Sequence, residues 1–353
     1  MAVIKVPLKM LVPIALNDGL EGQVNYAETL ASALGCDVRY LHVLSPGGGS
    51  QSESSEIDRR FAMLENDNVH IIREKLMEVL EKQDRSNKSI SELIFMAGKS
   101  VPATILDEAR MHDADIILCG AAKASVGILP EALSTVLSVM GKAPIPVIVA
   151  PPQKPSEFNK TKFRIVVADD LGPDSVAAVR WALSLASHIM ACRVFHVHVE
   201  PLTREVAIET FYATSCGSDI PIVPEFDPGV LYDQKMEATK KNLESRLTQL
   251  GIGGTIDKAN YETQLFSGSV AEVIAHESEL DFADLIVFGR HHFIHNHPLA
   301  LGKVSYKTML RQHYPVVVVP STFLKSADSS QRVPTGMINE DEYVESSLTI
   351  HYP

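Results

Sequence analysis

The segment Asp115-Ile-Ile-Leu-Cys-Gly120 returns 169 positions later as Asp284-Leu-Ile-Val-Phe-Gly289. The segment Pro146-Val-Ile-Val-Ala-Pro151 returns at the same distance as Pro315-Val-Val-Val-Val-Pro320. Each segment contains a short apolar run without alternation, which is typical of a parallel strand buried on both faces of its sheet. Two blocks repeated at one spacing indicate that the chain contains two copies of one fold.

A shorter spacing relates the first parts of the two copies. Leu41-His42-Val43 matches Phe195-His196-Val197 at 154 positions, and the same spacing pairs Ala15 with Asp169. The spacing therefore grows by 15 positions within the second copy. We assign the extra residues to an insertion at 201–230, whose prolines, glycines and mixed polar residues are typical of a loop.

Each copy is expected to alternate strands with amphipathic helices. The first helix of each copy should face the core with one apolar stripe. The stripe residues are Val24, Ala27, Leu30, Ala31 and Leu34 in the first copy, and Val176, Val179, Leu183, Ala186 and Met190 in the second. This order predicts an α/β fold of two tandem, doubly wound, Rossmann-like domains with parallel five-stranded sheets, related by a pseudo-two-fold axis.

The two copies are expected to form separate domains. A chain of 353 residues is long enough for two domains of about 150 residues each. We expect the domains to span 1–150 and 163–321, with 151–162 as a linker. The remaining 322–353 is expected to be an acidic, polar tail. Its end, 337–353, mixes apolar residues with acids in a composition that can fold onto a partner.

Charge and composition exclude several classes of protein. The chain carries 32 basic and 44 acidic residues, a net charge of −12, which argues against a nucleic-acid-binding surface. No apolar run is long enough to span a membrane, and the N-terminal residues lack the layout of a signal peptide. The four cysteines show no CxxC spacing, so a reduced, cytoplasmic protein is expected. These are Cys36, Cys119, Cys192 and Cys216.

A further shared pattern precedes the third helix of each copy. It comprises Gly98-Lys99-Ser100-Val101 followed by Ile105, and Gly268-Ser269-Val270 followed by Ile274. With the repeated strands, this organisation resembles the universal stress protein family in its tandem form, over nearly the whole chain except the insertion and the tail. The resemblance implies that the last strands, 146–150 and 315–319, pair with each other as an internal pseudo-dimer. It leaves the association of two chains as a homodimer open.

The resemblance also implies adenine-nucleotide binding, because one group of family members binds ATP. In that group a Gly-x2-Gly-x9-Gly-Ser/Thr pattern lies between the fourth strand and the last helix, and an Asp ends the first strand. Glycines let backbone N–H groups approach phosphates, and a helix N-terminus favours negative charge. Carried onto the second copy, the cofactor-binding residues are Asp169, Gly289, His292, Gly302, Lys303 and Val304.

The second copy departs from the family pattern at two of these positions. His292 replaces the second glycine, and Lys303 replaces the hydroxyl residue. We expect Arg290, His292 and Lys303 to supply cationic donors to the phosphates. The first copy keeps Gly120 but has Ala15 for the Asp and lacks two of the glycines. Because each lost hydrogen bond to a phosphate costs about 1.5–3 kcal/mol, we expect ATP or another adenine nucleotide to bind in the second domain.

Other chemistry is less well supported. The run 290–297 holds four histidines, which could ligate zinc or nickel, but a loop of exposed histidines explains it as well, and we assign no metal. No arrangement of nucleophile, base and acid is evident, so we expect no catalysis and consider slow nucleotide hydrolysis the least supported function. We therefore expect a regulatory, nucleotide-binding stress protein. The alternative is a scaffold that binds no nucleotide and docks a protein partner through the insertion and the tail.

Overall fold

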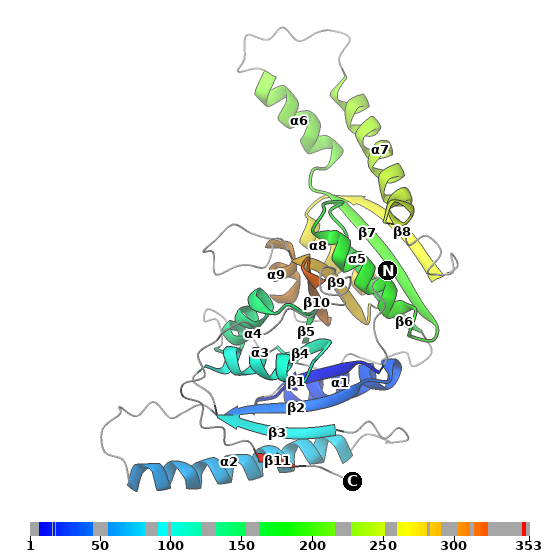
Figure 1. The fold of residues 1–353 in the computed structure, drawn as a ribbon. Helices are drawn as coiled ribbons and strands as arrows, with labels where there is room; N and C mark the ends of the chain where they lie inside the picture. The colour runs from blue at the N-terminus through cyan, green and yellow to red at the C-terminus, as the bar shows by residue number, and fades with distance from the viewer. Residues whose placement is uncertain are drawn as a thin grey trace, which may run out of the picture.

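The computed structural model contains two copies of a β-α-β fold that share one sheet (Figure 1). It describes residues 7–15, 17, 19–44, 56–81, 91–97, 100–121, 131–152, 162–215, 227–250, 260–280, 283–290, 303–310, 314–323 and 348–350. The first copy comprises β1 (Lys9–Pro13), α1 (Leu20–Leu34), β2 (Asp37–Leu44), α2 (Glu56–Glu81), β3 (Ser91–Ala97), α3 (Val101–Met111), β4 (Ile116–Gly120), α4 (Glu131–Lys142) and β5 (Val147–Ala150).

The second copy repeats this order with one helix more. It comprises β6 (Phe163–Ala168), α5 (Ser175–Ala186), β7 (Cys192–Glu200), α6 (Arg204–Ser215), α7 (Pro228–Gln249), β8 (Tyr261–Ser267), α8 (Val270–Leu280), β9 (Leu285–Arg290), α9 (Lys303–Leu310) and β10 (Val316–Pro320). A short strand, β11 (Leu348–Ile350), follows near the C-terminus. The predicted α/β fold class of two doubly wound units is confirmed.

The strands form one sheet of eleven in the order β11-β3-β2-β1-β4-β5-β10-β9-β6-β7-β8. Within each copy all neighbouring strands are parallel. The copies meet where β5 and β10 pair antiparallel, with Val316 opposite Val149 and Val318 opposite Val147. The predicted pairing of the last strands is therefore confirmed. It leaves neither of these two strands as an exposed edge.

Most residues of the predicted apolar stripes are buried in the core, while Val176 of α5 is half-buried. All five stripe residues of α1 are buried, as are Val179, Leu183 and Ala186 of α5. Met190 was predicted wrongly: α5 ends at Ala186, and the Met190 side chain is 92% exposed. Three of the four cysteines lie in the core, and burial raises the pKa of each thiol to about 12; they are Cys36, Cys119 and Cys192.

The structure corrects the alignment of the two copies. The ring of His42 hydrogen-bonds through Nδ1 to the carbonyl oxygen of Ile14 (2.9 Å), and the ring of His198 does the same to Asp169 (2.7 Å). His42 therefore corresponds to His198 at a spacing of 156, and Asp169 corresponds to Ile14 rather than Ala15. The predicted spacing of 154 was wrong in both strands.

The described parts of the insertion and the tail form regular elements. The insertion contains the helix α6 and the start of α7, where a loop was expected. The tail contributes β11, which pairs antiparallel with β3 through Leu348 opposite Phe95 and Ile350 opposite Leu93. Within the described ranges, no helix is both long and apolar enough to cross a membrane.

Candidate nucleotide site in the second copy

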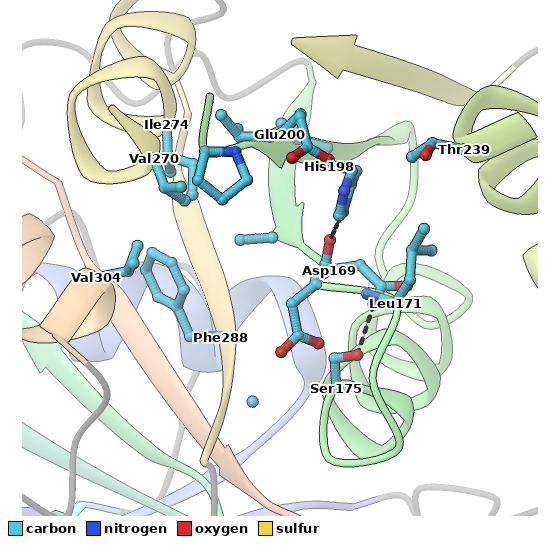
Figure 2. A pocket seen from close by; sticks show the side chains of 16 residues that line it. Asp169, Leu171, Ser175, His198, Glu200, Thr239, Val270, Ile274, Phe288 and Val304 are labelled. Atoms are coloured by element: carbon cyan, nitrogen blue, oxygen red, sulfur yellow. Dashed lines mark hydrogen bonds between the residues drawn. The ribbon is translucent and has the colours of Figure 1, made fainter. Parts of the chain in front are cut away.

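A pocket of about 490 Å3 lies at the carboxyl ends of β6, β7 and β9. This is where the strand order of the second copy reverses, and open α/β sheets bind ligands at such a position. In Figure 2, Asp169, Leu171 and Ser175 lie on one side of the pocket, and Phe288 and Val304 lie across from them. The lining residues on the adjoining strand and helices include Val199, His198, Glu200, Thr239, Val270 and Ile274.

The loop between β6 and α5 is organised by the Asp169 carboxylate, which is buried. Its Oδ1 accepts hydrogen bonds from the Leu171 N–H (2.7 Å) and from the Ser175 hydroxyl (2.5 Å). Its Oδ2 lies 2.9 Å from His196 Nε2 and accepts from Arg246 Nε at 3.0 Å. A carboxylate has about four lone-pair positions, and these four contacts fill them.

The charge of Asp169 is stabilised although it is buried. Burial by itself would raise the pKa of this carboxyl, but the hydrogen bond and charge of His196, the Ser175 hydroxyl and the Arg246 guanidinium outweigh it and lower the pKa to about 2. Arg246 also donates to the Gly172 carbonyl at 2.7 Å. The guanidinium therefore ties the loop after β6 to α7, and Asp169 remains ionised at neutral pH.

Leu171 holds an unusual backbone conformation within this loop. Its φ is +62°, in the left-handed region that favours glycine, and its side chain lines the pocket. The hydrogen bond from the Leu171 N–H to Asp169 accompanies this conformation. The wall of the pocket thus depends on a strained residue that the surrounding contacts hold in place.

The polar rim of the pocket lies at the end of β7. His198 Nδ1 donates to the Asp169 carbonyl, because a carbonyl oxygen can only accept, and in the neutral ring Nε2 is then an acceptor. Glu200 is buried and accepts a hydrogen bond from Lys235 Nζ of α7 at 2.7 Å. The Glu200 carbonyl accepts from the Gly268 N–H at 2.8 Å, where a φ of +133° requires glycine.

The opposite wall is apolar. Val270 and Ile274 come from the first turns of α8, Phe288 from β9, and Val304 from the start of α9. The family pattern predicted that Ile274 follows the glycine turn, and its side chain is buried against the sheet. Apolar walls with a few polar groups at the rim are typical of a site for a small molecule.

The structure brings together three of the six predicted site residues. Asp169, Gly289 and Val304 all line the pocket. Lys303 is the first residue of α9, whereas His292 and Gly302 lie outside the described residues. A side chain at Gly289 would come within 2.9 Å of the Asp174 carbonyl, so this glycine is required by the packing of β9 on α5.

Arg290 does not take the role expected for it. Its guanidinium donates to the carbonyls of Met140 (2.7 Å) and Ala143 (2.9 Å), at the C-terminal end of α4 in the first copy. A cation there satisfies carbonyls that a helix leaves without partners. Arg290 therefore links the two copies, and the prediction that it donates to a phosphate is wrong for this structure.

The family pattern missed four polar residues at the site: His198, Glu200, Thr239 and Arg246. Arg246 and Thr239 come from α7, far from every glycine of the pattern, and no motif marks them. His198 could have been found from the His-Val pair at the end of each second strand. The first copy lacks the acidic pair, since Ile14 and Leu44 stand where the second copy has Asp169 and Glu200.

No cluster of three potential metal ligands occurs among the residues that the structure describes, which do not include 291–300. The four histidines of the run 290–297 lie outside the described residues.

Comparison with known proteins agrees with this architecture. A universal stress protein from Archaeoglobus fulgidus DSM 4304 has a TM-score of 0.56 and 16% identity, covering 88% of this chain and 96% of its own. A functionally unknown protein from Pseudomonas aeruginosa PAO1 has a TM-score of 0.54 and 14% identity, covering 90% and 95%. At these identities the likeness shows the fold alone.

No match was found among curated proteins. The model of the Universal stress protein family matches residues 8–151. The family match therefore covers the first copy, and the second copy repeats the same fold.

Proposed function

We propose that this chain is a regulatory universal stress protein that binds an adenine nucleotide in the pocket of its second copy, without catalysis. The observation that carries the proposal is the position of this pocket, at the reversal of strand order and beside Gly289 at the end of β9. We further propose that the copies act as separate domains, 1–150 and 163–321, joined by 151–162.

The size and lining of the pocket fit a nucleoside. Its volume of about 490 Å3 falls within the roughly 300–1,000 Å3 of small-molecule sites. The base would lie against Phe288 and Ile274, with its polar edge toward His198 and Glu200. These rim groups are acceptors, so they suit a base that presents an amino group.

The phosphates would lie toward α9. The described lining residues include no Lys or Arg, so this part of the pocket offers no cation to a phosphate. Val304, in the first turn of α9, lines the pocket, and a helix N-terminus attracts anions. His292, Gly302 and Lys303 would complete the phosphate side.

Asp169 would act on the ligand indirectly. Because its lone pairs are filled by Leu171, Ser175, His196 and Arg246, it would shape the loop that forms the pocket wall rather than bind the ribose or the base. Ser175 donates to Asp169 and accepts from Arg246, which leaves its hydroxyl engaged and is consistent with binding without catalysis.

The proposal is tested by denaturing the purified protein and identifying any released nucleotide by chromatography and mass spectrometry. The wild type should release ATP, ADP or AMP, and a His292→Ala/Lys303→Ala variant should release much less. An empty wild-type protein that also fails to bind millimolar ATP would contradict the proposal. That outcome would favour the scaffold function, for which the exposed apolar residues of α6 and α7 are the supporting observation.

A further inference from the structure

The third strands of the two copies, β3 and β8, stand at equivalent places in the sheet but differ in their outer edges. Each has only one neighbour from its own copy. Charged residues on such a strand discourage pairing with a further strand. β8 carries Glu262, which forms an ion pair of 2.8 Å with Arg193 of β7, and both side chains are nearly half exposed. Among the described strands, none pairs with the outer edge of β8.

The sequence of β3 offers little protection of this kind. After Ser91 and Glu92 it contains five apolar residues in succession, Leu93-Ile94-Phe95-Met96-Ala97. An apolar edge strand without proline or charge is a template for pairing with another segment. The outer edge of β3 is therefore a place where the backbone N–H and C=O groups of a further extended segment can bind.

The C-terminal tail of the chain already occupies part of this edge. β11 pairs antiparallel with residues 93–95 of β3, at the end of the sheet opposite β8 (Figure 1). The other neighbouring strands of the first copy are parallel to one another, so β11 is an addition to a complete domain. Its sequence, Leu348-Thr349-Ile350, shows which kind of segment the edge accepts: an extended one that is apolar and β-branched.

The pairing between β11 and β3 is short enough to be exchanged. β11 has three residues and β3 has seven, so β11 leaves part of the outer edge of β3 uncovered. A strand of three residues gains few hydrogen bonds in return for the backbone entropy that it loses. A longer extended segment would pair with the whole of β3 and displace β11.

We propose that the outer edge of β3 is an acceptor site for an extended peptide segment of a partner protein, and that the chain's own β11 masks it. The peptide adds one strand to the sheet, and main-chain hydrogen bonds supply the affinity. Its sequence is apolar and β-branched and contains no proline, like that of β11. Because β3 belongs to the first copy, this proposal does not rest on nucleotide binding in the second copy.

The test measures binding of a fluorescent peptide of residues 345–353 to the full chain by anisotropy. In the variant Leu348→Pro/Thr349→Pro, two adjacent prolines remove a ladder hydrogen bond whichever residue donates it, so the tail no longer pairs. We expect this variant to bind the peptide at least ten times more tightly than the wild type, whose tethered β11 competes for the edge. The control Ser329→Pro/Ser330→Pro places its prolines outside β11 and should behave as the wild type.

Amide hydrogen exchange locates the bound peptide. In the tail variant the amides of β3 should exchange faster than in the wild type, and the peptide should restore their protection, whereas exchange in β8 should not change. A second variant, Leu348→Asp/Ile350→Asp, detaches the tail without prolines and should give the same result.

Three outcomes would overturn the proposal. The first is that the wild type and both tail variants bind the peptide equally, or that none of them binds it. The second is that the peptide protects β8 instead of β3. The third is a tail variant that dimerises through β3 and excludes the peptide, because the occupant of the edge would then be a second copy of the chain.

Discussion

Replacing Arg246 with Met should destabilise the second copy strongly, because this change leaves the buried Asp169 carboxylate without its guanidinium partner. Arg246 contacts the two carboxylate oxygens at 3.0 and 3.4 Å and the Gly172 carbonyl at 2.7 Å. Removing one partner of a buried ion pair typically costs about 3–5 kcal/mol of unfolding free energy. Since His196 and Ser175 remain bound to Asp169, we expect the lower end, about 3 kcal/mol.

The assay is urea unfolding at pH 7, with Arg193→Met as the control. Arg193 forms an ion pair of 2.8 Å with Glu262, but both side chains are nearly half exposed, so its loss should cost about 1 kcal/mol or less. In the double variant Asp169→Asn/Arg246→Met the losses should be clearly less than additive, because both changes remove the same contact. An Arg246→Met variant no less stable than Arg193→Met would refute this reasoning.

The same ion pair makes stability depend on pH. The pKa of Asp169 is lowered from its ordinary 3.8 to about 2 in the folded state, a difference worth about 2 kcal/mol. This contribution is fully present well above pH 3.8 and is lost as the pH falls toward 2. Wild-type unfolding free energy should therefore drop over this range, and Asp169→Asn should remove that part of the dependence.

Three further predictions concern single residues. Leu171→Gly should raise the unfolding free energy or leave it unchanged, since relief of the left-handed φ of +62° is worth about 1 kcal/mol; a clear loss of stability would contradict the strain argument. Gly289→Ala should cost about 1–3 kcal/mol, because the added Cβ would lie 2.9 Å from the Asp174 carbonyl; a neutral change in a melting experiment would count against this. Cys119, whose burial raises its pKa to about 12, should react with a thiol reagent at pH 8 only after unfolding; fast labelling of the native protein would be inconsistent with the buried site.

The sequence predicted those parts of the fold that rest on local apolar pattern. The strands with repeated blocks and the helix stripes required no distant information, and the pairing of β5 with β10 followed from the family resemblance. The alignment of the second strands failed for a definite reason. The stretch Phe195-His196-Val197-His198-Val199 contains the His-Val pair twice, and only the hydrogen bond from His198 to Asp169 shows which one corresponds to His42.

The parts of the site that the sequence missed depend on contacts across long distances. Arg246 reaches Asp169 over 77 residues, and Arg290 caps α4 over 150 residues. Neither contact can be predicted from neighbouring residues. In the sequence, Arg246 looks like an ordinary surface arginine of a helix, and Arg290 looks like an ordinary arginine at the end of a strand. The helix α6 was missed because the prolines and glycines of the insertion flank it and mask its short helical segment.

The central claim is that the nucleotide binds in the second copy, and calorimetric titration of ATP into three proteins tests it most directly. The proteins are the wild type, Val304→Trp, which fills the pocket at the start of α9, and Thr135→Trp, which makes the same change at the equivalent position of the first copy. We expect the wild type and Thr135→Trp to bind ATP with the same affinity and Val304→Trp to bind at least ten times more weakly. Unchanged binding by Val304→Trp, or a loss confined to Thr135→Trp, would contradict the claim.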